Sequence, residues 1–126
     1  MGILETAKPV IIVCVRERAR AVAFYRDTLG LVMTGEDDWA AIFDVGGNAM
    51  RVSTVADFKP HEHTMLGFKV PDVAAAVKAL RDKGVTINIY PGFQHDELGI
   101  LTVPGSGMRV AWFNDPDGNV LSVTNA

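Results

Sequence analysis

The sequence predicts an α+β domain made of two β-α-β-β-β modules, whose curved mixed sheets surround a cleft. Three observations support this. A short apolar, β-branched run is followed by a helical pattern twice in the 126 residues. The two copies match at an offset of 55, including an "RD" pair near each helix end. Later segments alternate apolar and polar residues as half-buried strands do.

The first module begins with the run PVIIVCV (residues 9–15), which predicts a strand. A helix is expected over residues 17–30, because apolar residues recur there at helical spacing and Gly30 can end it. The turn signal GGN predicts a hairpin. The three strands that complete the module are predicted in LVMTGED, WAAIFDV and AMRVSTV.

The second module repeats this order. A strand in TMLGFKV precedes a helix over residues 71–84, for which Asp72 is the expected N-cap. The next strand is predicted in VTINIY, and a Gly- and Pro-containing stretch follows over residues 91–107. A hairpin around the turn DPDG ends the module, with strands in RVAWF and NVLSV.

The predicted boundaries are 1–57 for the first module, 58–62 for a connector and 63–126 for the second module, within one domain. The strands are expected to have one apolar face under the helices and one mixed face. Arg51, Ser53 and Ser122 fall on the mixed face, which would line the cleft. Such clefts are the usual place for a small-molecule site.

Composition narrows the classes of partner. The net charge is −3, with 12 basic residues scattered among 15 acidic ones, which argues against nucleic acid. Cys14 is the only cysteine, so no internal disulfide can form, as in a reducing cytoplasm. No signal peptide is recognised, and no apolar run approaches the ~20 residues that span a bilayer. We therefore expect a cytoplasmic protein without a membrane or nucleic-acid partner.

Two motifs carry a resemblance to a known family. FYRDTLGL (residues 24–31) and AWFNDPDGNVLSV (residues 111–123), together with the β-α-β-β-β repeat, resemble the vicinal oxygen chelate superfamily. This superfamily includes glyoxalases, bleomycin-resistance proteins and extradiol dioxygenases. The motifs identify the fold and leave the activity open, because their roles are to pack a helix and to turn a hairpin. The resemblance also implies a homodimer.

In metal-dependent members of that family, four side chains hold a divalent ion. The resemblance places the four positions at Val10, Arg51, Met65 and Ser122. Val10 has no donor atom, and Arg51 is a permanent cation. Met65 and Ser122 are weak ligands for Zn, Ni, Mn or Fe. We therefore expect no metal and no other cofactor. The alternative metal ligands are His61 and His63, considered together with the sequence HDE at residues 95–97.

The predicted function is the binding of a small molecule in the cleft without metal, as in bleomycin-resistance proteins. The ligand would be anionic if Arg51 faces the cleft unpaired, although a protein carboxylate such as Asp44 or Glu97 could pair with it instead. The candidate ligand-binding residues are Cys14, Arg51, Ser53, Met65, Tyr90, Phe93, His95, Trp112 and Ser122.

Two alternatives stay open. The first is an enzyme of the same superfamily, a lyase or isomerase like glyoxalase or a dioxygenase. It would use a displaced metal site or His95 as an acid or base. The second is a non-catalytic interaction protein whose cleft is filled by side chains.

Overall fold

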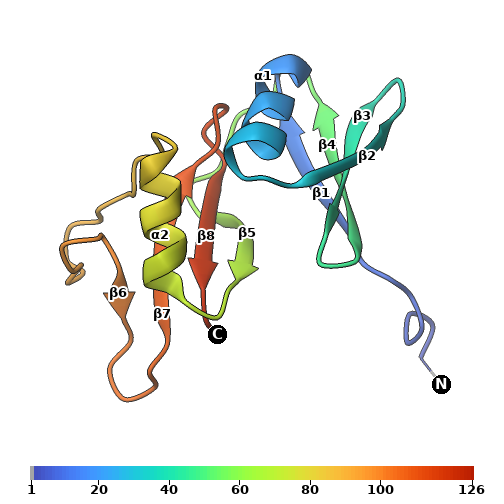
Figure 1. Cartoon of the computed structure of the whole chain (residues 1–126). Helices are drawn as coiled ribbons and strands as arrows, with labels where there is room; N and C mark the ends of the chain where they lie inside the picture. Colours follow the sequence, from blue (N-terminus) through green and yellow to red (C-terminus); the bar gives the residue numbers. More distant parts are fainter. Residues whose placement is uncertain (1) are drawn as a thin grey trace. The chain divides into compact units, whose positions relative to one another are not determined.

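The computed structural model describes residues 2–126 of the chain, which divides into two compact units. The first unit extends to Phe58 and the second comprises Lys59–Ala126. Each unit contains one four-stranded mixed sheet and one helical segment, shown along the chain in Figure 1. Among these residues, no helix is long and apolar enough to cross a membrane.

The first unit contains β1 (Val10–Val15), β2 (Val32–Glu36), β3 (Ala40–Val45) and β4 (Asn48–Thr54). Their order in the sheet is β1-β4-β3-β2, with β1 parallel to β4 and the other pairs antiparallel. The predicted GGN turn is confirmed, because Gly46 and Gly47 join β3 to β4 with positive φ angles of 58° and 88°.

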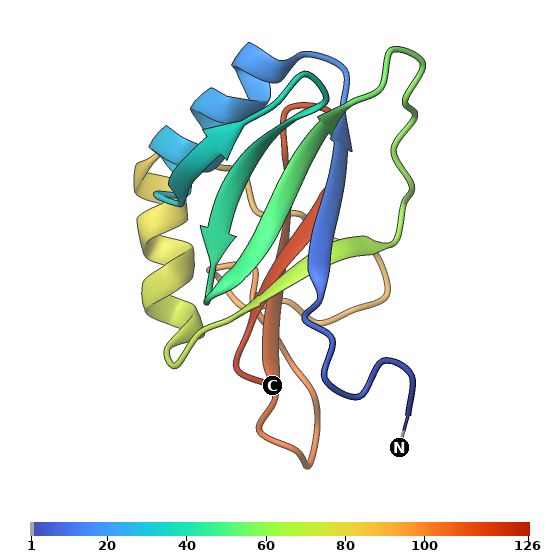
Figure 2. The same ribbon diagram turned by 90° about the vertical axis from the view of Figure 1, so that its right-hand side faces the viewer.

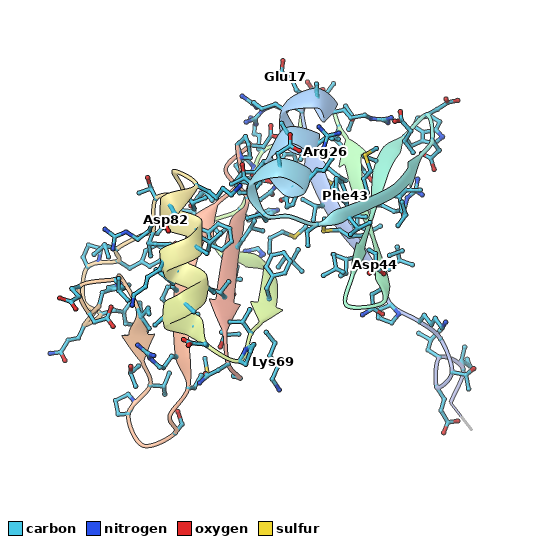
Figure 3. All side chains as sticks on the ribbon, viewed as in Figure 1. Glu17, Arg26, Phe43, Asp44, Lys69 and Asp82 are labelled. Carbon is cyan, nitrogen blue, oxygen red and sulfur yellow. The ribbon has the colours of Figure 1, made fainter. Side chains whose placement is uncertain are left out.

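One face of this sheet forms the core of the first unit. Val13, Val52 and Ala41 form one cross-strand row, and all three are buried. Phe43, in the next row, lies 6.2 Å from Tyr25 between ring centroids. Its neighbour Asp44 is exposed, and Figure 3 labels both residues on β3. The alternation along the strand therefore separates core from surface as predicted.

The helix of the first unit differs in part from the prediction. It starts as α1 (Arg18–Val22) and continues as a π-helical segment, η1 (Ala23–Thr28). The wider turn is seen in the hydrogen bond from Leu29 N–H to the Phe24 carbonyl, which is 2.9 Å long and joins residues five positions apart. Gly30 ends the helix with φ of 76°, as expected.

The second unit contains β5 (Thr64–Lys69), β6 (Leu101–Thr102), β7 (Arg109–Asn114) and β8 (Val120–Thr124). Their order is β5-β8-β7-β6, which repeats the strand order of the first unit. The helix α2 (Val73–Asp82) lies over one face of this sheet, as Figures 1 and 2 show in yellow. The predicted N-cap is confirmed: Asp72 accepts a hydrogen bond of 3.0 Å from Ala75 N–H.

Two cross-strand rows form the core of the second unit, Leu66–Leu121–Phe113 and Phe68–Val123–Ala111. Val73 and Val77 on α2 are buried on the same side. The alternate rows point to the opposite face of the sheet, here called the open face. One of these rows is Gly67–Ser122–Trp112.

The predicted strand in VTINIY is wrong. Residues 85–90 make only an isolated bridge between Ile87 and Phe113 and a bond from Asn88 N–H to the Trp112 carbonyl. The strand that pairs with the rest of this edge of β7 is β6, which lies within the stretch predicted as a loop. Residues 85–90 are therefore loop rather than strand.

Candidate functional site

Four aromatic and heteroaromatic side chains gather in the second unit, here called the aromatic cluster: Tyr90, Phe93, His95 and Trp112. Trp112 is the centre, with ring centroids 5.4 Å from Tyr90, 6.4 Å from Phe93 and 6.3 Å from His95. The sequence predicted all four as ligand-binding residues. The structure brings them together, although the 90–95 segment and β7 are separate in the chain.

The Trp112 ring is held on the open face of the sheet. Its Nε1–H donates a 3.0 Å hydrogen bond to Thr64 Oγ1 on β5. Tyr90 and His95 approach it edge-on, at interplanar angles of 80° and 72°, whereas Phe93 lies nearly parallel to it at 28°. Phe93 remains 58% exposed. The cluster thus combines a Trp112 ring held by a hydrogen bond with a nearly parallel, solvent-exposed Phe93 ring.

His95 uses both of its ring nitrogens to hold the loop. Tyr90 N–H donates to Nε2 at 3.1 Å, so Nε2 is an acceptor without a proton. Nδ1 lies 2.8 Å from the Gly99 carbonyl and must be the protonated nitrogen that donates to it. These two bonds fix a neutral tautomer, in which His95 supports the loop rather than presenting an acid or base.

Polar side chains that sequence reasoning missed lie next to the cluster. Asn88 Nδ2 donates to Tyr90 Oη at 3.2 Å and also to Asn114 Oδ1. Both asparagines line an open groove of about 850 Å³, here called the asparagine groove. Alternation could have identified them, because Asn88 lies two residues from Tyr90 and Asn114 two residues from Trp112.

The remaining candidates of the second unit are placed differently. Met65 lies at a β-bulge between Thr64 and Leu66 and is exposed. Ser122 is buried, 5% exposed, beside Trp112 and opposite Gly67. A Cβ added at Gly67 would lie 3.0 Å from Ser122 Oγ, so Gly67 and Ser122 leave each other no room for a larger side chain.

Arg51 lies on the face of the first sheet opposite its buried core, between Ile12 and Ile42 in the neighbouring strands. This face is here called the open face of the first unit. Its Nη2 donates to Asp37 Oδ2 at 2.7 Å. The protein carboxylate that pairs with Arg51 is therefore Asp37, and not Asp44 or Glu97 as the sequence suggested. The bond from Arg51, followed by that from Trp39 N–H, lowers the pKa of Asp37 to about 2.

The other first-unit candidates share this face. Cys14 and Ser53 are paired across β1 and β4, and both are half-buried. Val10 is exposed on the same strand as Cys14. The alternative ligands His61 and His63 are both exposed just before β5 and stack on each other, with ring centroids 5.1 Å apart.

The donor set does not fit a metal ion. Within residues 2–126, no group of three or more His, Cys, Asp or Glu side chains is arranged to hold one. At the positions that the family resemblance assigns to ligands, Arg51 is an ion-paired cation and Ser122 is buried against Gly67. Neither side chain offers the anionic or imidazole donor that such an ion needs.

The turn DPDG has a structural role, as predicted. Asp115 Oδ1 accepts hydrogen bonds from the N–H groups of Asp117 and Asn119, both at 2.9 Å. Asp115 Oδ2 accepts a third bond, at 2.8 Å, from Asn119 Nδ2. Gly118 has φ of 90°, which the tight turn between β7 and β8 requires. The Asp115 carboxylate therefore holds the hairpin together.

Comparison with known structures supports the same fold. A protein described as of the glyoxalase family from Bacillus anthracis has a TM-score of 0.76 and 16% identity, covering 98% of each chain. A superfamily member from Sphaerobacter thermophilus has a TM-score of 0.75 and 22% identity, covering 97% of this chain and 98% of its own. A glyoxalase family protein from Enterococcus faecalis has a TM-score of 0.69 and 18% identity, over 98% and 99%.

These identities are low and show the fold alone. The comparison with curated proteins found no match. The sequence profile of one family, however, covers nearly the whole chain, from residue 7 to residue 123. Together with the repeated β-α-β-β-β topology, this match shows that the chain belongs to the Glyoxalase/Bleomycin resistance protein/Dioxygenase superfamily.

Proposed function

We propose that this protein binds a flat small molecule at the aromatic cluster of the second unit, without a metal ion. The main support is the environment of Trp112. Its ring is hydrogen-bonded to Thr64 and lies nearly parallel to Phe93, which is 58% exposed. Aromatic stacking contributes ~0.5–1.5 kcal/mol per pair beyond area burial. A ligand that stacked on Trp112 would also cover the exposed Phe93.

This proposal changes the expected charge of the ligand. An anionic ligand was expected only if Arg51 lay unpaired in the cleft. Its guanidinium instead donates to Asp37 at 2.7 Å, and the low pKa of Asp37 keeps that carboxylate charged at neutral pH. Arg51 then stabilises the first unit, and stacking in the second unit supplies the binding energy.

The enzymatic alternative receives less support from the site. A general acid or base must reach the proton that it transfers, and both nitrogens of His95 already bond within its own loop. We therefore propose that the protein binds its ligand without catalysis, in the manner of the bleomycin-resistance members of the superfamily. A cytoplasmic homodimer belongs to the same proposal and rests on composition and on the family resemblance. Sedimentation of the purified protein tests the dimer.

Tryptophan fluorescence tests the proposal directly. The two tryptophans are Trp39 and Trp112, so Trp39→Phe leaves Trp112 as the only reporter. Flat heteroaromatic compounds should quench it saturably in the presence of a chelator. Phe93→Ala should weaken binding by roughly five- to hundredfold, because stacking of a base on an aromatic ring is worth ~1–3 kcal/mol.

Trp39→Ala is the matched control, since Trp39 is 74% exposed in the first unit. Calorimetry should find the same affinity for this variant as for the unmodified protein. Binding that appears only after a divalent ion is added would contradict the proposal. So would an equal loss of affinity in Trp39→Ala and Phe93→Ala.

A further inference from the structure

The asparagine groove adjoins the aromatic cluster through Tyr90, which belongs to both. It is lined by residues 60–62 and 88–90, with Asn114, Gly118 and Val120. Its volume of about 850 Å³ lies within the range of small-molecule sites. The hydrogen bonds determine which of its polar atoms are donors and which are acceptors. These atoms indicate which groups a ligand would need.

A chain of hydrogen bonds fixes the amide orientations. The Gly118 carbonyl can only accept, so Asn114 must direct Nδ2 toward it, at 3.1 Å. Asn114 Oδ1 then accepts from Asn88, which must direct its own Nδ2 inward. That Nδ2 also donates to Tyr90 Oη at 3.2 Å. The backbone carbonyl at one end thus determines every donor and acceptor along the chain.

Two groups at the Tyr90 end of this series of hydrogen bonds can still bond to a ligand. The Tyr90 oxygen accepts from Asn88, so its own O–H proton is available to donate. Asn88 Oδ1 points away from its two Nδ2 bonds and is available to accept. Within residues 2–126, neither group has another hydrogen-bond partner. Both residues are half-buried, so water reaches these two groups less easily than it reaches exposed ones. A ligand that bonded to them would satisfy their hydrogen-bonding capacity.

The charges around the groove argue against an anionic ligand. Its lining includes Glu62 and His61 and, among the described residues, no Lys or Arg. Recognition of a carboxylate or phosphate normally uses such cations, and Arg in particular. An uncharged group is therefore favoured at this end of the site.

We infer that the ligand carries a cyclic amide, a lactam or imide whose N–H and C=O lie side by side on a flat ring. The N–H would donate to Asn88 Oδ1 and the C=O would accept from the Tyr90 hydroxyl. The ring would stack on Trp112. This inference rests on the proposed function and specifies the class of molecule that the site takes.

Two matched probes test it: isoquinolin-1(2H)-one and its N-methyl derivative. Both are flat and uncharged and carry the same C=O, but only the first has an N–H. Calorimetry should show the lactam binding about tenfold more tightly than the N-methyl compound, equivalent to ~1.4 kcal/mol. Isoquinoline-1-carboxylate should bind more weakly than either.

Variants separate the two contacts. Asn88→Ala should bring the affinity ratio of the two probes close to one, because it removes the acceptor that only the lactam uses. Tyr90→Phe should weaken both probes and preserve the ratio, because both use the hydroxyl. Gln94→Ala, on an exposed side chain of the same loop, is the control and should change neither value. Thermal melting shows that each variant is folded.

The outcomes distinguish the two proposals. If both probes bind with equal affinity and Phe93→Ala weakens them, the stacking site stands and the cyclic-amide inference is wrong. A ratio that survives in Asn88→Ala also overturns it. If no flat compound binds at all, the proposed function itself fails, and this inference with it.

Discussion

Gly99 gives the sharpest test of how the loop over residues 85–100 is built. It has φ of 88°, in the left-handed region that glycine tolerates. A Cβ there would lie 2.6 Å from Ile87 Cγ2 and 3.2 Å from Ile87 Cβ. The Gly99 carbonyl also accepts the Nδ1 proton of His95, and Ile87 precedes Asn88. Gly99→Ala should therefore disturb the loop and the groove together.

The expected loss of stability has two parts. A left-handed conformation costs a non-glycine residue ~1–2 kcal/mol. The overlap with Ile87 adds ~1–3 kcal/mol, because a packed neighbour must move. Gly99→Ala should thus lower the free energy of unfolding by about 2–5 kcal/mol. Gly92 lies in the same loop with φ of 92° and no atom within 4 Å of an added Cβ, so Gly92→Ala should show only the conformational part.

The assay is urea unfolding followed by Trp112 fluorescence, in the Trp39→Phe background. The difference between Gly99→Ala and Gly92→Ala isolates the overlap with Ile87. A difference below about 0.5 kcal/mol would show that the close approach of Gly99 to Ile87 does not exist, since the overlap alone should cost ~1–3 kcal/mol. Lactam binding should also be weaker in Gly99→Ala than in Gly92→Ala.

Two further predictions concern titration and capping. The pKa of Asp37 is lowered from 3.8 to about 2, so its stabilising bonds are fully present above pH 3.8 and are lost as the pH falls through about 2. Urea unfolding should show a smaller loss of stability between these two pH values in Asp37→Asn than in the unmodified protein; equal losses would contradict this. Asp72→Ala should lower the free energy of unfolding by ~1 kcal/mol through loss of an N-cap, whereas Asp82→Ala at the other end of the helix should not.

Strand alternation and capping were readable from the sequence because they are local. Asp72 precedes an apolar helical pattern, and that position alone identifies it as a cap. Residues of β4 and β7 alternate between faces as their sequence predicts, which places Arg51 and Trp112 on the open faces. Where the required information lies within a few residues, the prediction and the structure agree.

The failures come from information that is not local. VTINIY has the composition of a strand, but the edge of β7 that it would pair with is shared. Asn88 bonds to one end of that edge, while β6 pairs with Val110 and Arg109 at the other. The partner of Arg51 was missed for a similar reason, because Asp37 reaches it through the turn between β2 and β3. Both outcomes depend on contacts between segments that are separate in the sequence.

The two units show how one framework can be kept while its chemistry diverges. Their strand orders are identical, and Arg51 and Ser122 occupy the same place in each: Arg51 pairs with Ile12 and Ser122 with Gly67. In the first unit this position carries a cation that bonds to Asp37. In the second it carries a small buried side chain beside Trp112.

The difference between these two residues explains why we place the ligand in the second unit. An ion pair already satisfies the polar group of Arg51, so a ligand there would have to replace a 2.7 Å bond. In the second unit, the Trp112 ring, the Tyr90 hydroxyl and the Asn88 carbonyl can make new contacts. Binding energy is gained where groups are oriented but not yet fully paired, as the Tyr90 hydroxyl and the Asn88 carbonyl are in the second unit.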